Sequence, residues 1–112
     1  MKEGRFNCVG FAFYKLGLKE ADKFIKPPSY KKLLENFLIV TEEQADVIGV
    51  IIKPEGFKKP LVHHIAIIDP KDRRFIIHRA SHDAPISRMV RKELLEWYGG
   101  SYFTIINLKL KT

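Results

Sequence analysis

One stretch of the sequence, residues 7–17 (NCVGFAFYKLG), constrains the fold more than any other. Its central residues are almost all apolar, and a helix that is apolar on every side belongs inside a fold. Asn7 is a good N-terminal cap, because its side-chain oxygen can accept from a free backbone amide of the first turn. Gly17 suits a left-handed C-terminal cap. The sequence therefore predicts a buried helix that begins at Cys8.

Cys8 is the only cysteine in the chain, so no internal disulfide can form. At the first position of a helix, free backbone N–H groups and the positive end of the helix dipole favour the thiolate, which is the nucleophilic form. Most free cysteines are instead small buried hydrophobic residues. Taken alone, this stretch leaves both interpretations of Cys8 open.

Length and composition are those of a single globular domain. The chain has 112 residues, of which 46% are hydrophobic and 29% charged, which is enough for a core without cross-links. No apolar run reaches membrane-spanning length, and no secretory signal is present at the N-terminus. We therefore expect a cytoplasmic location, unless the protein is exported without an N-terminal signal.

The formal net charge of +7 would suit an anionic partner, such as nucleic acid, anionic lipid or an acidic polymer. The lysines and arginines are scattered in short clusters, and no run of five occurs. No nucleic-acid-binding signature is present. A solvated basic surface is therefore the simpler expectation.

Hydrophobic spacing predicts helices in the first part of the chain and strands in the second. The expected helices cover residues 7–17, 30–38 (capped by Ser29) and 91–98, and the expected strands cover 45–52, 61–69, 73–80, 86–90 and 102–110. Residues 53–60 are expected to form a turn region, and Trp97 and Tyr98 to face the core. This order predicts an α+β fold in which N-terminal helices pack on a mostly antiparallel sheet.

Two expected neighbouring strands carry histidines, which could serve Cys8 as a base and as a group that orients the base. His63 and His64 lie in the first strand and His78 in the second. A three-residue loop at 70–72 would set His64 opposite His78, whereas a four-residue loop would bring His63 to that face. Periodicity does not choose between these registers.

Three segments together resemble the NlpC/P60-type cysteine peptidases, a papain-like superfamily with the CHAP amidases as near relatives. NCVGFAFYKLG is similar to the family's D-C-S-G-F-V-x-x-V/L-x-x-x-G segment, ADVIGVI to its G-D-L-V-x-F strand, and HHIAIIDPKDRRFIIHRAS to its H-V-G-I-Y-x-G-x-G-x-F-I-H-A strand pair. The resemblance covers about residues 6–81. It implies one papain-like domain over residues 1–112.

The resemblance implies an amidase or thiol protease with Cys8 as nucleophile, His64 as base and His78 as the orienting residue, without a cofactor. The motif's H-x-[GA] spacing favours His64 over His63. The implied substrate is a peptide or peptidoglycan-like amide, in a peptide derived from the cell wall or in another peptide. Further candidates for substrate contacts are Asn7, His63, His82 and Arg79, where Arg79 would bind a carboxylate or lie at a solvated strand end.

Other functions remain open on the same residues. An acyltransferase, thioesterase or deamidase could use the same triad, and an inactive domain could bind an anionic partner through its basic surface. A zinc site would need Cys8 and three of the histidines at 63, 64, 78 and 82. No spacing typical of zinc ligands supports that site.

Overall fold

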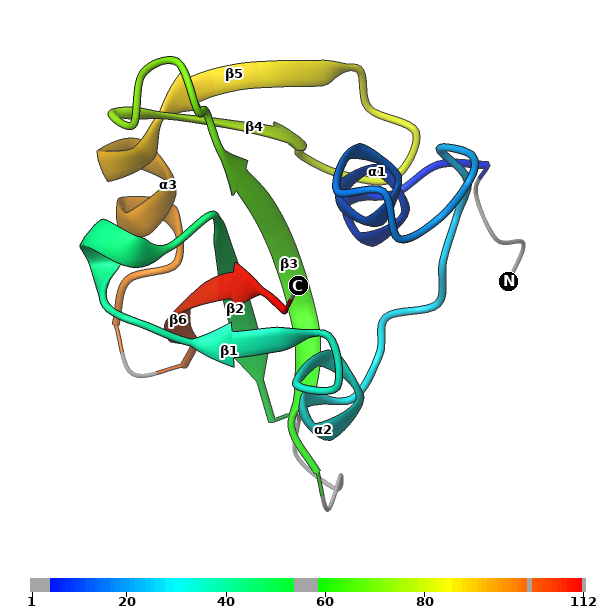
Figure 1. Ribbon diagram of the computed structural model, residues 1–112, viewed down its shortest axis with the longest axis horizontal. Coiled ribbons are helices and arrows are strands. Elements are labelled where there is room, and N and C mark those ends of the chain that lie inside the picture. The colour runs from blue at the N-terminus through cyan, green and yellow to red at the C-terminus, as the bar shows by residue number, and fades with distance from the viewer. Residues whose placement is uncertain (1–4, 54–58, 101, 112) are drawn as a thin grey trace.

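The computed structural model describes residues 5–53, 59–100 and 102–111, which form a small α+β domain (Figure 1). The expected turn region 53–60 lies largely outside the described residues. The elements in chain order are α1 (Cys8–Lys15), α2 (Tyr30–Leu33), β1 (Phe37–Ile39), the 3-10 helix η1 (Glu42–Gln44), β2 (Val47–Ile52), β3 (Leu61–Ile68), β4 (Phe75–Arg79), β5 (Ile86–Val90), α3 (Arg91–Trp97) and β6 (Thr104–Leu110).

The six strands form one sheet in the order β1-β6-β2-β3-β4-β5. Each pair of neighbours is antiparallel, which confirms the expected α+β class and sheet type. In the described residues, no helix is long and apolar enough to cross a membrane.

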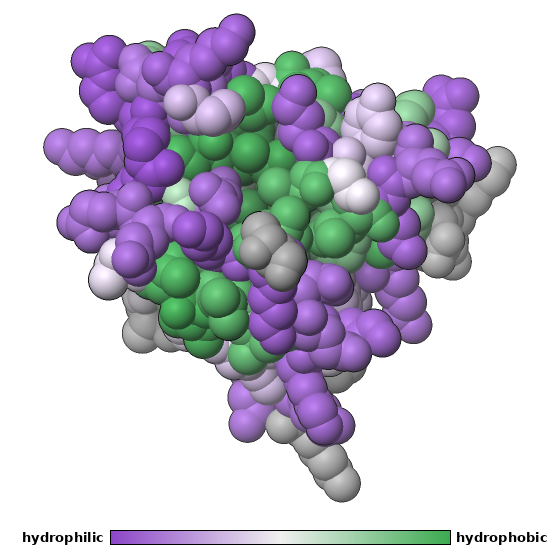
Figure 2. Space-filling model, in the orientation of Figure 1, coloured by the Kyte–Doolittle hydropathy of each residue, from purple (hydrophilic) through white to green (hydrophobic). Residues whose placement is uncertain are grey.

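Alternating side chains divide the core between the two faces of the sheet. In β3, Ile65 and Ile67 pack with residues of α1 and α2, whereas Ala66 and Ile68 pack with Leu94 of α3. This is the period-two pattern of a strand that is buried on both faces. Helices α1 and α2 therefore cover one face, and α3 covers the other. Figure 2 shows hydrophobic side chains in the middle of one side of the molecule, with hydrophilic ones around them.

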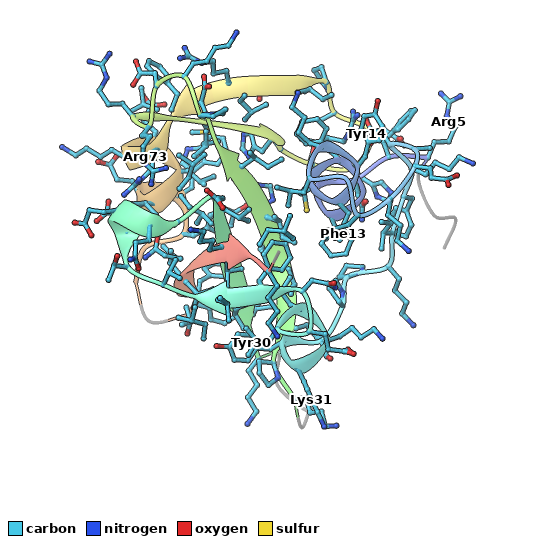
Figure 3. All side chains as sticks on the ribbon, viewed as in Figure 1. Arg5, Phe13, Tyr14, Tyr30, Lys31 and Arg73 are labelled. Carbon is cyan, nitrogen blue, oxygen red and sulfur yellow. The ribbon has the colours of Figure 1, made fainter. Side chains whose placement is uncertain are left out.

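Helix α1 confirms the prediction at both ends. It begins at Cys8 after the Asn7 cap, and Gly17 follows it with φ +80°. Its central residues are buried, and the ring of Phe13 (Figure 3) lies 6.3 Å from that of Phe37 in β1. The buried helix holds Cys8 in a fixed position against the sheet.

The second expected helix is wrong beyond its first turn. Ser29 caps α2 by accepting from the Lys32 amide, but α2 ends at Leu33. Phe37 instead begins β1 and pairs with Leu110 of β6, and its side chain is buried in the core. Strand pairing at this sheet edge therefore overrides the helical spacing of residues 30–38.

The expected burial of Trp97 is also wrong, because 58% of this residue is exposed. Helix α3 buries only Leu94 fully, and Tyr98 follows its last turn in a half-buried position. A seven-residue helix has room for a narrow apolar stripe, and Trp97 falls outside it.

Strands β3 and β4 pair at two positions, Ile67 with Ile77 and Ile68 with Ile76. Beyond these pairs the two strands diverge, and α1 packs against both of them on the side where they separate (Figure 1). The start of α1 is thereby brought to the histidines of the two strands.

Candidate active site

Asn7 fixes the start of α1 and a distant part of the chain together. Its Oδ1 accepts from the amides of Gly10 (2.9 Å) and Ile25 (3.2 Å), and its Nδ2 donates to the Ile25 carbonyl (2.7 Å). The side chain is buried. Asn7 lines the candidate site, but these bonds hold the backbone around Cys8.

The structure brings His64 and His78 into direct contact. Their Nε2 and Nδ1 atoms lie 2.8 Å apart, and both side chains are buried. Both expected registers are wrong, since continuing the observed pairing sets His78 opposite Ala66. His64 lies two residues from Ala66 on the same strand, so the two histidines meet diagonally on one face of the sheet.

A β-bulge explains why two consecutive histidines reach the same site. Pairing between β2 and β3 shifts by one residue between Val50, opposite His64, and Ile51, opposite Val62. His63 is the extra residue, and bulges re-aim side chains in this way. His63 is exposed but lines the same cavity as His64.

The Cys8 thiol lies against the edge of β3, where the side chain donates to the His63 carbonyl (Sγ···O 4.0 Å). Burial raises the pKa of Cys8, and hydrogen bonds from the amides of Ile65, Val9 and Cys8 itself lower it by less. Burial thus outweighs the helix-start effect that the sequence suggests. The resting side chain is a neutral thiol.

The histidines 63, 64 and 78 are neutral at rest as well. Burial, with smaller contributions from His78 and His63, lowers the pKa of His64 to about 3. Burial also lowers the pKa of His78 and of His63. Near pH 7, Cys8 is therefore a thiol beside an uncharged His64, rather than half of a thiolate–imidazolium pair.

Cys8 and the histidines 63 and 64 line a cavity of about 430 Å³. Its wall includes Cys8, His63, His64, Ser81, His82 and Tyr98. His82 stacks on Phe24, with ring centroids 5.3 Å apart. Except for His78 and Arg79, every sequence-predicted site residue lines this cavity.

Tyr98 is the site residue that sequence reasoning missed. Its ring stacks on His64 at 5.6 Å and 29°, and meets His63 edge-on at 5.6 Å. Its position on an amphipathic helix suggested a core residue. The sequence holds no signal that would have separated a tyrosine packed on a histidine from one packed on leucine.

Arg79 serves the scaffold instead of lying at a solvated strand end. Its buried guanidinium forms an ion pair with Asp22 (Nη2···Oδ2 2.6 Å), donates to the Ala84 carbonyl and lies 4.8 Å over the Phe6 ring. The expected solvation of Arg79 is wrong. Its contacts join the segment before α1 to the loop after β4.

Asp83 strengthens the same connection. Its Oδ1 accepts from the amides of Arg5 (3.1 Å) and Phe6 (3.0 Å), and its own amide donates to the Phe6 carbonyl. The residue has φ +56°, which Asp tolerates better than most residues. The loop that carries His82 therefore holds the chain that leads into Cys8.

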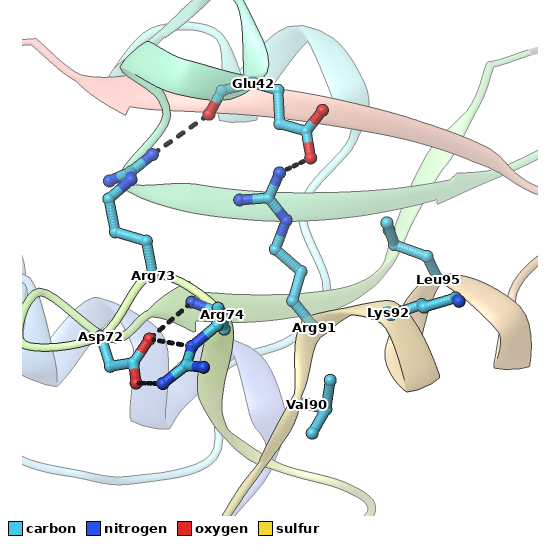
Figure 4. Close-up of a pocket in the computed structure, with 8 residues that line it drawn as sticks. All are labelled: Glu42, Asp72, Arg73, Arg74, Val90, Arg91, Lys92 and Leu95. Carbon is cyan, nitrogen blue, oxygen red and sulfur yellow. Dashed lines mark hydrogen bonds and ion pairs between the residues drawn. The ribbon is translucent and has the colours of Figure 1, made fainter.

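A second, larger cavity of about 680 Å³ lies among charged side chains (Figure 4). Arg91 forms an ion pair with Glu42, and Arg74 with Asp72 (Nη2···Oδ2 2.7 Å). Arg73 donates to three backbone carbonyls of residues 42–45, including that of Glu42. The three arginines of this cavity thus already bind neighbours in the fold.

The described residues contain no group of three or more His, Cys, Asp and Glu side chains arranged to hold a metal ion. Comparison with protein-family models, with characterised protein sequences and with solved structures gives no match to this chain. Inferences about function therefore rest on the chemistry of the site and on the motif resemblance.

Proposed function

We propose that this chain is a papain-like cysteine hydrolase of NlpC/P60 type that cleaves an amide bond in a peptide, including one derived from the cell wall. Cys8 is the nucleophile, His64 the base and His78 the residue that orients the base. The observation that carries this proposal is the His64–His78 hydrogen bond, in a site that Cys8 also lines.

The hydrogen bond defines which nitrogen of His64 can act as base. Its Nε2 is occupied by His78, so Nδ1 is the atom available to the thiol. For Nδ1 to accept a proton, the proton of neutral His64 must sit on Nε2 and be donated to His78 Nδ1. His78 is then a positioning residue that selects the active tautomer, as the third group of a triad does.

The first step in this mechanism is attack by Cys8 on the substrate carbonyl as His64 takes the thiol proton. The resting pair is neutral, so charge separates during the reaction. The negative charge on sulfur, and then on the carbonyl oxygen, stabilises the imidazolium that forms. The backbone amide of Cys8, at the start of α1, is a donor to that oxygen.

Acylation by p-nitrophenyl acetate, an activated ester, tests the proposal without a known substrate. We expect release of p-nitrophenolate with one acetyl group on Cys8, detected by mass spectrometry of the intact protein and its peptides. Cys8→Ala should abolish acylation, and His64→Ala should slow it strongly. The proposal fails if Cys8 in the folded protein reacts no faster than a free thiol and if His64→Ala has no effect.

A thioester is the second candidate substrate, cleaved or transferred by the same residues. Phe24, Pro27 and Ala80 give the cavity an apolar wall, which suits an acyl chain. Comparison of kcat/KM for an acyl thioester and for a peptide anilide with the same acyl group separates the two. If kcat/KM for the thioester exceeds that for the anilide by more than their difference in chemical reactivity, a thioester substrate is favoured.

A further inference from the structure

The start of α1 gives an oxyanion one donor, and a tetrahedral intermediate is best stabilised by two or more. The polar side chain of Asn7, just before Cys8, is already hydrogen-bonded to Gly10 and Ile25. Another residue that lines the cavity can supply the second donor.

Tyr98 lines the same cavity as Cys8 and belongs to a different element. It follows α3, where its backbone amide donates to the Leu94 carbonyl (3.3 Å). His64, His63 and Phe103 surround its ring, with centroids 5.1 to 5.6 Å away. These three ring contacts hold the Tyr98 side chain in place at the cavity wall.

The Tyr98 hydroxyl is available as a donor. Among the described residues it has no hydrogen-bond partner, although the residue is only half-buried. Burial raises the pKa of Tyr98, and Cys8 raises it further, by a smaller amount, when its thiol is ionised. The hydroxyl therefore keeps its proton when negative charge develops beside it.

We propose that the Tyr98 hydroxyl is the second donor to the oxyanion that forms when Cys8 attacks a carbonyl. This inference rests on the proposed function. Cys8 Sγ bonds to the carbonyl carbon, and the C=O π electrons move to oxygen, where Tyr98 and the Cys8 amide donate to it. When the intermediate collapses, the bond to the leaving group breaks, and His64 returns the thiol proton to that group.

Two reactions of the same thiol separate this role from packing on His64. Acylation by p-nitrophenyl acetate passes through an oxyanion, whereas alkylation by iodoacetamide is a direct displacement and forms none. In Tyr98→Phe we expect acylation to slow about 10²-fold, as for loss of one oxyanion donor. Alkylation of Cys8 should stay within about twofold of wild type, because Phe keeps the ring on His64.

Tyr102→Phe is the matched control, because Tyr102 contacts Phe103 but is largely exposed and does not line the cavity. Both of its reactions should match wild type. The inference is overturned if Tyr98→Phe leaves acylation unchanged, or if it slows both reactions equally, which would indicate a packing role. If wild-type Cys8 is not acylated at all, the proposed function fails, and the role of Tyr98 with it.

Discussion

The two largest groups of polar side chains around cavities in this fold differ in what their atoms already bind. In the larger cavity, Arg91 pairs with Glu42 and Arg74 with Asp72, so each of these charges is paired with an opposite charge in the cavity wall. In the smaller one, Cys8, His64 and Tyr98 line one space and are neutral groups. The larger cavity (Figure 4) is therefore a contact between elements, whereas the smaller one is the site that we propose for the reaction.

The elements explain this difference. The arginines of the larger cavity connect η1, the turn before β4 and the start of α3. The smaller cavity forms where β3 and β4 diverge and where α1, α3 and the loop after β4 meet. Because β3 and β4 diverge here, the His63 carbonyl at the edge of β3 accepts from the Cys8 thiol instead of from a neighbouring strand.

The largest expected effect is on the rate of Cys8 acylation, compared between one variant in each cavity. His64→Ala should slow acylation of Cys8 by p-nitrophenyl acetate about 10³-fold, because it removes the base. Arg91→Ala, in the larger cavity, should leave the rate within about twofold. Stopped-flow absorbance of p-nitrophenolate measures both. Similar decreases in the acylation rate of the two variants would mean that the reaction does not take place in the smaller cavity.

Gly10→Ala tests whether the support of Cys8 is as rigid as its contacts imply. A Cβ at Gly10 would lie 1.7 Å from the Lys23 carbonyl oxygen, which is backbone and cannot rotate away. We expect a loss of about 3 kcal/mol in the free energy of unfolding, which outweighs the helix propensity gained. Urea denaturation followed by circular dichroism measures this loss.

Gly99→Ala is the control for that variant, because its Cβ would meet the nearest atoms at an ordinary 3.5 Å. It should change the free energy of unfolding by less than about 1 kcal/mol. Equal losses in the two variants would mean that the contact between α1 and residue 23 is not tight.

Local signals in the sequence were enough for the scaffold of the site. The cap at Asn7 and the glycine after α1 located the start of the helix, because capping depends on neighbours within one turn. Apolar, β-branched runs located β2, β3 and β4. The pairing of His64 with His78 on one face followed from the resemblance, and the structure brings these two side chains together.

The remaining features depend on contacts between distant residues. The β3–β4 turn closes with the Asp69 amide donating to the Phe75 carbonyl, a longer loop than either one expected. Asp69 and Asp72 each accept from a backbone amide two residues on, and turn residues of this kind permit several loop lengths. The bulge at His63, the burial of Arg79 and the approach of Tyr98 leave no local pattern either.

As the pH falls, protonation of His64 in the smaller cavity should lower the free energy of unfolding before protonation of Asp72 in the larger cavity does. Burial lowers the pKa of His64 to about 3, from 6.5 for an ordinary histidine. Between these values the unfolded chain binds more protons, so stability is lost as pH falls below about 6.5. From pH 7 to 4.5, His64 should contribute a loss of about 2 to 3 kcal/mol. Urea denaturation at the two pH values measures the total.

The variant His64→Gln separates this contribution, since every other group still titrates in it. We expect it to lose less stability than wild type over the same interval. Asp72 of the larger cavity adds nothing there, because the hydrogen bonds from Arg74 lower its pKa to about 2 and it stays charged at pH 4.5. Equal acid sensitivity of wild type and His64→Gln would mean that His64 is not held neutral by burial.

The smallest expected effect concerns the ion pair between Arg91 and Glu42. The Arg91 side chain is 13% exposed and that of Glu42 is 60% exposed, so water screens the pair. Glu42→Gln should therefore lower the free energy of unfolding by only about 0.5 kcal/mol and should leave acylation of Cys8 unchanged. High salt should reduce the difference further. A loss of several kcal/mol would mean that this pair behaves as a buried one, and a slower acylation would connect the two cavities that the fold keeps chemically separate.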